Sequence, residues 1–156
     1  MADFYRMPAF ATLAVSDIEK SVKWYQTALG FSLVFTMPSA DGGKHLCHLR
    51  LSKYADIMLV SRPTSVSGSV PNGVIFLTFA LFNESVDEVA ERLLRLGDTR
   101  FEGPFDRPWN AREIIITDPD GFKIVMTAPI DSTSTIDDVV ASVQALTTHQ
   151  FLWSLD

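Results

Sequence analysis

The sequence contains an internal repeat, and this repeat constrains the fold more than any other feature. Two segments with helical character end at Gly30 and Gly97, and strand-like segments follow each of them in the same order. An offset of 67 residues superposes the two glycines and also superposes the apolar run at 57–59 on the run at 124–126. A repeated supersecondary unit cannot bury its hydrophobic face alone. The chain is therefore predicted to fold as two similar halves that share a core.

Each half has the pattern of a strand, a helix and three further strands. Short apolar runs separated by turn residues indicate the strands, among them FATLAV, ADIMLVS and FKIVMTAP. The turn before the last of these strands is predicted at Asp118-Pro119-Asp120-Gly121, where proline and glycine suit the turn geometry. The fold class is therefore α+β, with two tandem β-α-β-β-β modules.

Both helices carry start and stop signals. A serine and a glutamate have capping-box spacing at the start of each helix, and a glycine suits the left-handed C-cap at its end. These residues are Ser16, Glu19 and Gly30 in the first half, and Ser85, Glu88 and Gly97 in the second. An apolar stripe predicts the packed face of the first helix: Ile18, Val22, Tyr25 and Leu29.

Composition and the repeat set the domain boundaries. A segment rich in Ser, Pro and Gly separates the modules, and a further helical pattern follows the second one. The helix is expected to start after a cap at Ser134 or Thr135 and to pack on the sheet or on a second subunit. The predicted boundaries are 8–62 for the first module, 63–73 for the linker, 74–130 for the second module and 131–156 for the C-terminal helical extension.

The charge and the cysteine count exclude several classes of function. A net charge of −6 argues against a nucleic-acid partner, because phosphate binding needs clustered Lys and Arg. The acidic surface suits cationic ligands, although solubility alone also explains it. No apolar run approaches the ~20 residues that cross a bilayer, so no membrane partner is expected. The single cysteine, Cys47, and the lack of a signal-peptide pattern predict a cytoplasmic protein.

Two motifs and the duplication resemble the vicinal oxygen chelate superfamily, which includes glyoxalases, extradiol dioxygenases and bleomycin resistance proteins. The motifs are LAVSDIEKSVKWYQTALGF and RPWNAREIIITDPDGFKIV, and the resemblance covers about residues 9–129. It implies that the sheets of the two modules curl around a cavity and that the protein is a homodimer. The resemblance is specific for the superfamily and much less so for any one activity.

The metal enzymes of this superfamily place His or Gln on the first strand of a module and Glu on the last. Those positions fall on Phe10 and Thr78 for the first strands, and on Met58 and Val125 for the last strands. None of these is a good ligand for a divalent metal, and a neutral hydroxyl is a poor one. We therefore expect neither a metal nor another cofactor, and we expect the last strand to line an apolar pocket.

Other residues with metal-ligand or acid–base chemistry form no complete site. On a strand, His45 and Cys47 share one face while His48 lies on the other, so at most two ligands converge, short of the three or four that zinc needs. Asp56 and Glu113 are general-base candidates if they are buried. Otherwise they are solvated charges that guard a sheet edge. No catalytic residue is assigned.

The candidate ligand-binding residues are those of the empty metal positions and of the second motif. A planar ring before the third strand of the second module could stack on a ligand, and a nearby arginine could bind an anionic group. The alternatives are a packed core, an aromatic plug and a structural ion pair. The candidates are Phe10, Thr12, Met58, Thr78, Trp109, Arg112 and Val125.

The sequence favours a small-molecule-binding protein that resembles bleomycin resistance proteins and holds a cationic or aromatic, antibiotic-like ligand in an apolar cavity. The alternative is a lyase, isomerase or dioxygenase of the same superfamily. That alternative needs a metal site built from His45, His48 or Asp56, or a proton transfer without metal. A third hypothesis is that the C-terminal helix fills the groove, which would leave an interaction module.

Overall fold

The computed structural model of the protein describes residues 7–63 and 75–146. Most of the predicted linker at 63–73 and the end of the C-terminal extension, 147–156, lie outside the described residues. The first module contains β1 (Ala11–Val15), α1 (Ile18–Leu29), β2 (Ser32–Pro38), β3 (Lys44–Ser52) and β4 (Ala55–Ser61). The second contains β5 (Phe76–Ala80), α2 (Val86–Leu96), β6 (Arg100–Arg107), β7 (Ala111–Thr117) and β8 (Lys123–Pro129), and α3 (Ile136–Gln144) follows.

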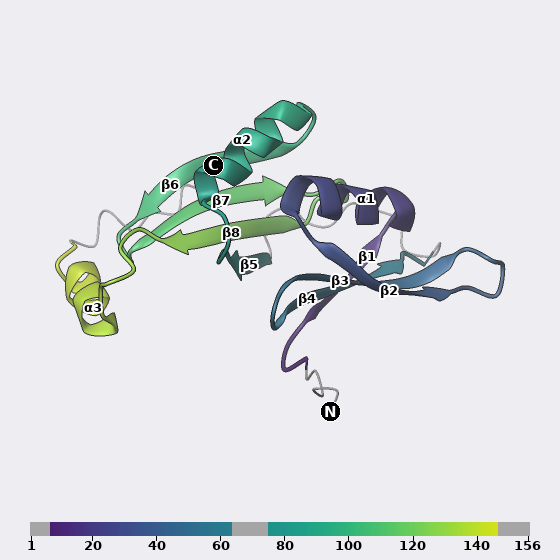
Figure 1. Cartoon of the computed structure of the whole chain (residues 1–156), viewed down its shortest axis with the longest axis horizontal. Helices are drawn as coiled ribbons and strands as arrows, with labels where there is room; N and C mark the ends of the chain where they lie inside the picture. Colours follow the sequence, from purple (N-terminus) through teal and green to yellow (C-terminus); the bar gives the residue numbers. More distant parts are fainter. Residues whose placement is uncertain (1–6, 64–74, 147–156) are drawn as a thin grey trace.

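Each module forms a four-stranded mixed sheet. The strand orders are β1-β4-β3-β2 and β5-β8-β7-β6, and the first and last strands of each module pair in parallel while the other neighbours pair antiparallel. Both α1 and α2 cover the same side of the two sheets, so the opposite side of each sheet, here called its open side, carries no helix of its own module (Figure 1). The predicted α+β fold with two modules and a C-terminal helix is confirmed.

One hydrophobic core lies between the helices and the sheets of both halves. Because strand side chains alternate between the two faces, every second residue of the central strands faces the helices. The predicted stripe of α1 is buried, and the fully buried strand residues include Ile57, Leu59, Ile114, Ile116, Ile124 and Met126. This core is continuous, so the two halves stabilise one another as the repeat predicted.

The helix caps confirm three of the four predicted signals and correct the fourth. Ser85 and Glu88 form the capping box of α2, and Gly30 and Gly97 adopt φ of 75° and 81°. At α1, however, the N-cap is the next residue, Asp17, whose carboxylate accepts a hydrogen bond from the backbone N of Lys20 at 3.1 Å. The prediction that Ser16 is the N-cap was wrong because the backbone N of Ser16 donates a hydrogen bond to Asp120 of the second module.

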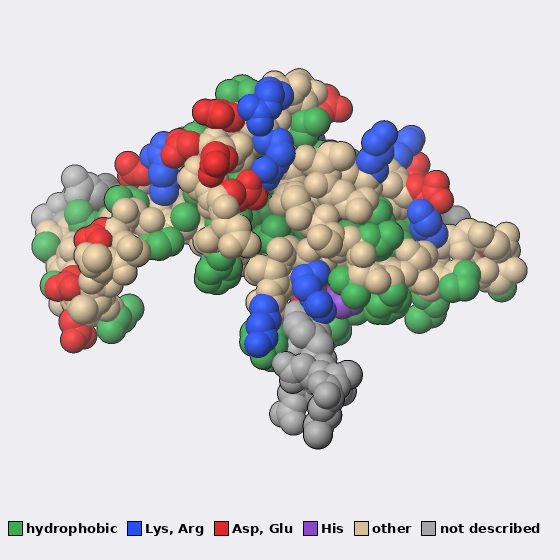
Figure 2. All heavy atoms as spheres, in the orientation of Figure 1, with side chains coloured by type: hydrophobic (Ala, Val, Ile, Leu, Met, Phe, Trp, Pro, Cys, Tyr) green, Lys and Arg blue, Asp and Glu red, His purple; other side chains and the backbone are tan. Residues whose placement is uncertain are grey.

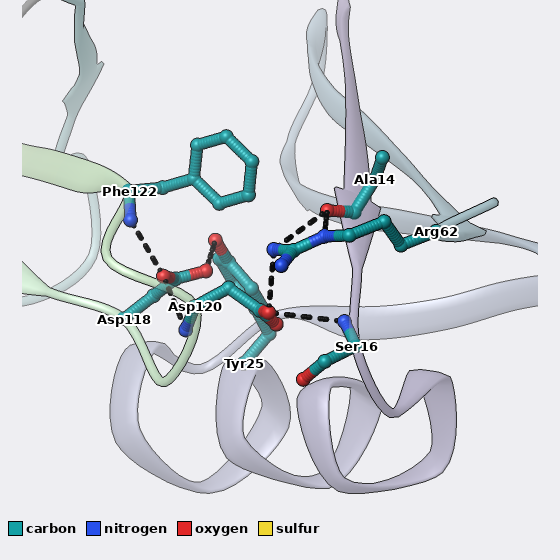
Figure 3. Close-up of polar contacts among 7 residues, drawn as sticks. All are labelled: Ala14, Ser16, Tyr25, Arg62, Asp118, Asp120 and Phe122. Atoms are coloured by element: carbon teal, nitrogen blue, oxygen red, sulfur yellow. Dashed lines mark hydrogen bonds and ion pairs between the residues drawn. The ribbon is translucent and has the colours of Figure 1, made fainter. Parts of the chain in front are cut away.

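The turn between β7 and β8 forms as predicted and connects the second module to α1. Gly121 has φ of 98°, and its backbone N donates to Asp118 O at 3.0 Å. The Asp118 carboxylate accepts from the backbone N of Asp120 and of Phe122 through Oδ1, and from the Tyr25 hydroxyl through Oδ2 at 2.9 Å (Figure 3). Tyr25 is fully buried, so the turn is anchored inside the shared core.

The same turn also binds the first sheet. Asp120 Oδ1 accepts hydrogen bonds from the backbone N of Ser16 at 3.0 Å and from Arg62 Nη2 at 2.8 Å (Figure 3). Arg62 in turn donates to the backbone oxygen of Ala14 on β1. The two carboxylates of one turn therefore hold the start of α1, the end of β1 and the residue after β4.

The C-terminal helix α3 begins after Thr135, one of the two predicted caps, in a capping box with Asp138. None of its residues is buried, and Ile136 is 74% exposed. The expectation that α3 packs on the sheet of its own chain was wrong, because the chain leaves β8 through hydrogen bonds between Asn110 and Asp131 that direct it away from the core (Figure 1). Packing on a second subunit stays a prediction.

We predict that Asp118→Asn changes how stability depends on pH. Burial raises the pKa of Asp118 above its ordinary 3.8, so the folded state retains a proton that the unfolded state releases. This stabilisation is complete below that ordinary value and is lost as the pH rises through the raised pKa, with a slope of at most about 1.4 kcal/mol per pH unit. The free energy of unfolding of the wild type, relative to D118N, should therefore fall with rising pH in urea titrations.

Asp17→Asn is the matched control. A backbone hydrogen bond from Lys20 lowers the pKa of the exposed Asp17, so its stabilisation is present above the ordinary value and is lost as the pH falls. The wild type relative to D17N should therefore gain stability as the pH rises. If the free energy of unfolding of the wild type changed with pH in the same direction relative to both variants, this would contradict a dominant effect of burial on the pKa of Asp118.

Candidate functional site

The strand register defines the pairs that correspond to the superfamily's metal positions. Thr12 lies directly across from Met58 on β1 and β4, and Thr78 lies across from Val125 on β5 and β8. Phe10 is the residue predicted to occupy the first-strand position, but it lies one residue before β1 begins. The residue that lies across from Met58 is Thr12. Because partners on parallel strands point to the same side, each pair shares one face of its sheet.

These four positions do not fit a divalent metal. They offer two neutral hydroxyls, a thioether and an alkyl group, whereas hard or borderline cations need carboxylates, imidazoles or thiolates. Among residues 7–63 and 75–146, no three His, Cys, Asp or Glu side chains are grouped so that they could hold a metal ion. The side chains at these four positions therefore do not form a site that would hold a catalytic metal ion.

A cavity of about 520 Å³ lies where the two modules meet. It is bounded by the start of β1, by the turn between β3 and β4 and by all of β5. Its volume lies in the range of small-molecule pockets. Of the seven candidate ligand residues, the structure brings Phe10 and Thr78 together in this wall, whereas Thr12, Met58, Trp109, Arg112 and Val125 do not line it.

Aromatic rings that the sequence analysis did not assign form much of this wall. Tyr54 stands at the β3–β4 turn with φ of 66°, a left-handed conformation that is uncommon for a non-glycine residue and often marks a functional position. Phe76 and Phe82 join it from β5 and the loop after it, and Phe82 is 76% exposed. Phe76 and Phe82 lie in the apolar run VIFLTFALF, and an apolar run alone does not distinguish a cavity wall from a core strand.

The open side of the first sheet carries a buried polar cluster. Asp56 Oδ1 lies 2.6 Å from His48 Nε2 and accepts from Arg50 Nε at 2.9 Å. The Asp56 side chain is fully buried, and the ring of Phe35 packs edge-on against His48. Because a guanidinium already shares the carboxylate oxygen, a metal cation there would meet a like charge. Cys47 is buried on the opposite face, against the helix.

The open side of the second sheet carries a second paired carboxylate. Glu113, which is mostly buried, accepts from Arg107 Nε at 2.9 Å and from Trp109 Nε1 at 3.1 Å. The Arg107 guanidinium lies 5.7 Å from the Trp109 ring centroid and 4.9 Å from that of Phe105. The indole of Trp109 is therefore held in place by both a hydrogen bond and a cation–π contact.

Arg112 lies on the other face of β7, toward α2. Its guanidinium donates two hydrogen bonds to the Asp87 carboxylate at 2.7 and 2.9 Å and also pairs with Asp106. These carboxylates raise the pKa of Arg112 above its ordinary value. The geometry is that of an ion pair at the start of α2, which was the alternative to ligand contact.

Comparisons with known proteins agree with this architecture. The family model described as the Glyoxalase/Bleomycin resistance protein/Dioxygenase superfamily matches residues 8–126. The chain belongs to this superfamily. A relative is the "Virulence protein STM3117" of Salmonella typhimurium, 31% identical over 115 residues that cover 70% of this chain and 74% of the relative.

Solved structures of the same fold include proteins that handle antibiotics. TnmS3, an antibiotic binding protein from Streptomyces sp. CB03234, is 26% identical, with a TM-score of 0.60 over 83% of this chain and 98% of its own. FosX from Listeria monocytogenes, a fosfomycin resistance protein complexed with Mn(II) and sulfate, is 18% identical. Its TM-score is 0.62 over 86% of this chain and 95% of its own, and at that identity the likeness shows the fold alone.

We predict that the protein retains no stoichiometric metal after purification without chelator and after incubation with zinc, nickel, manganese or iron. The reason is that none of the side chains at the four metal positions is a good ligand for a divalent metal: Thr12, Met58, Thr78 and Val125. Elemental analysis after dialysis measures the metal content. A stoichiometric metal that is lost in His48→Ala would contradict the prediction and would locate the ion at the His48–Asp56 pair.

Proposed function

We propose that the protein binds a small aromatic, antibiotic-like molecule in the cavity at the junction of the modules. The observation that carries this proposal is the cavity itself, about 520 Å³ in volume, with exposed aromatic side chains in its wall. Apolar walls with a few polar groups are typical of ligand sites. The likeness to TnmS3, an antibiotic binding protein, supports the same class of ligand.

The candidate residues take different roles in this proposal. Phe10 and Thr78 contact the ligand directly, since they line the cavity. Thr12 and Met58 are proposed to contact larger ligands that extend from the cavity along the sheets, whereas Val125, which is buried, would support that surface from within. Trp109 would serve as a fixed stacking surface at the far end of the second sheet, and Arg112 would act through its ion pair with α2.

We also propose that the protein is a homodimer. Edge strand β2 exposes four large apolar side chains, Leu33, Val34, Phe35 and Met37, each between 39% and 47% exposed. Hydrophobic side chains gather along the lower margin of the first half (Figure 2). Contiguous apolar surface of this kind marks an interaction site. A second copy would cover it and would provide a partner for the exposed residues of α3.

The proposed cellular setting of the protein is the cytoplasm. No helix of the described chain is long and apolar enough to cross a membrane. The one cysteine is free and buried, which supports a reducing, cytoplasmic setting.

A lyase, isomerase or dioxygenase activity has less support, because both buried carboxylates of the open sides, Asp56 and Glu113, are occupied by cationic and N–H donors.

We predict that Phe10→Ala weakens the binding of planar antibiotics. A panel that includes bleomycin and an anthracycline, titrated by tryptophan fluorescence and equilibrium dialysis, should contain at least one saturable ligand. Loss of the Phe10 ring removes apolar contact worth about 1–2 kcal/mol, which is a roughly 5- to 30-fold rise in Kd. Leu94→Ala is the control, because Leu94 is exposed on α2 and does not line the cavity. Equal effects of the two variants, or a flat response across the panel, would contradict the site.

We predict that Phe35→Asp converts a dimer into a monomer. A charge placed in the apolar surface of β2 must be desolvated in any interface that buries it. Size-exclusion chromatography with light scattering should give twice the chain mass for the wild type and the single chain mass for the variant. Leu94→Asp, on the exposed face of α2, should stay dimeric. A monomeric wild type at micromolar concentration would refute the proposal.

A further inference from the structure

The wall of the junction cavity does not share the negative charge balance of the whole protein, because it contains one basic and one acidic residue. The chain carries a net charge of −6, which favours cations at long range. Of the described residues that line the cavity, the two that are charged near neutral pH are Lys53 and Asp56. Lys53 lies in the β3–β4 turn and Asp56 lies on β4, on either side of Tyr54 in the sequence. Their environments decide which charge a ligand in the cavity meets.

The carboxylate of Asp56 is buried and paired, so its negative charge is not available to a ligand in the cavity. Its side chain is fully buried and its Oδ1 is shared by Arg50 Nε at 2.9 Å and His48 Nε2 at 2.6 Å. The guanidinium of Arg50 compensates the carboxylate at close range. A cationic ligand would therefore have to compete with a positive charge that is already in contact with the same oxygen.

The positive charge of Lys53 is presented at the cavity. Lys53 is exposed, and its Nζ lies 5.1 Å from the ring centroid of Tyr54, another wall residue. Within the part of the chain that the structure describes, no carboxylate forms an ion pair with Lys53. The ammonium thus stands next to an aromatic surface, and no carboxylate among the described residues pairs with it.

We propose that the ligand of the junction cavity is a planar aromatic anion, a molecule in which a carboxylate, phenolate or enolate is attached to the ring system. The inference rests on the proposed function and specifies its ligand. The rings of Phe10, Tyr54 and Phe82 contact the flat body, and Lys53 pairs with the anionic group. The net acidic surface does not reverse this preference, because charges farther away than about 8 Å are largely screened at physiological ionic strength.

Three probes with the same ring test the charge preference: 2-naphthoate, 2-naphthalenemethanol and 2-naphthylmethylammonium. Equilibrium dialysis at low and at physiological ionic strength gives a Kd for each. We expect the anion to bind about 2- to 5-fold more tightly than the neutral alcohol, as an exposed ion pair allows, and the cation to bind most weakly. The advantage of the anion should shrink as salt is added.

Variants assign the effect to Lys53. Lys53→Met keeps the aliphatic length and should reduce the affinity for 2-naphthoate to that for the alcohol, without changing the affinity for the alcohol. Lys53→Arg should preserve the anion's advantage. Lys23→Met, which removes an exposed lysine from α1, is the control and should change none of the three values. Phe10→Ala should weaken all three probes.

The outcomes separate this inference from the proposal on which it rests. Tightest binding of 2-naphthylmethylammonium, with Phe10→Ala still weakening every probe, would overturn the anion preference and leave the ligand site in place. An anion preference that survives Lys53→Met would overturn the role of Lys53. Absence of binding by all three probes and by the antibiotic panel would overturn both the inference and the proposed function.

Discussion

The carboxylates of Asp118 and Asp120 set the relative position of the two halves, and the junction cavity depends on that position. Asp120 binds the backbone of Ser16 and the side chain of Arg62, and Asp118 binds the hydroxyl of the buried Tyr25. These bonds join a turn of the second module to the first module across 58 to 104 residues of sequence. Because the cavity is bounded by β1 on one side and β5 on the other, a shift between the modules would change its width directly.

On the open sides of the two sheets, the polar side chains form hydrogen bonds and ion pairs with one another, whereas the apolar side chains have no such partners. His48, Asp56 and Arg50 satisfy each other on the first sheet, and Glu113 is satisfied by Arg107 and Trp109 on the second. A carboxylate with its oxygens occupied is a weak candidate for a base or a metal ligand. What the open sides offer to other molecules is therefore mainly apolar and aromatic surface.

The sequence predicted the elements of the fold better than the site, for a physical reason. Capping boxes, terminal glycines and the Asp118–Gly121 turn are local, so their residues alone indicate them. The N-cap of α1 was missed by one residue because the Ser16 backbone binds Asp120, a partner 104 positions away. Similarly, Tyr54 and Phe82 are unremarkable in sequence, and only the approach of the modules brings them to one cavity. The unburied α3 had an amphipathic pattern that does not specify what covers it.

Duplication itself explains why the cavity lies at the junction. The strands β1 and β5 are the edge strands of their sheets, and no ladder of hydrogen bonds joins them. Two four-stranded sheets that meet at such edges leave a gap, which one continuous sheet would close. Every residue of β5 borders this gap, as does Ala11 at the start of β1. A cavity at the junction does not depend on metal ligands on the central strands, so it is compatible with Thr, Met and Val at the positions that correspond to the metal site.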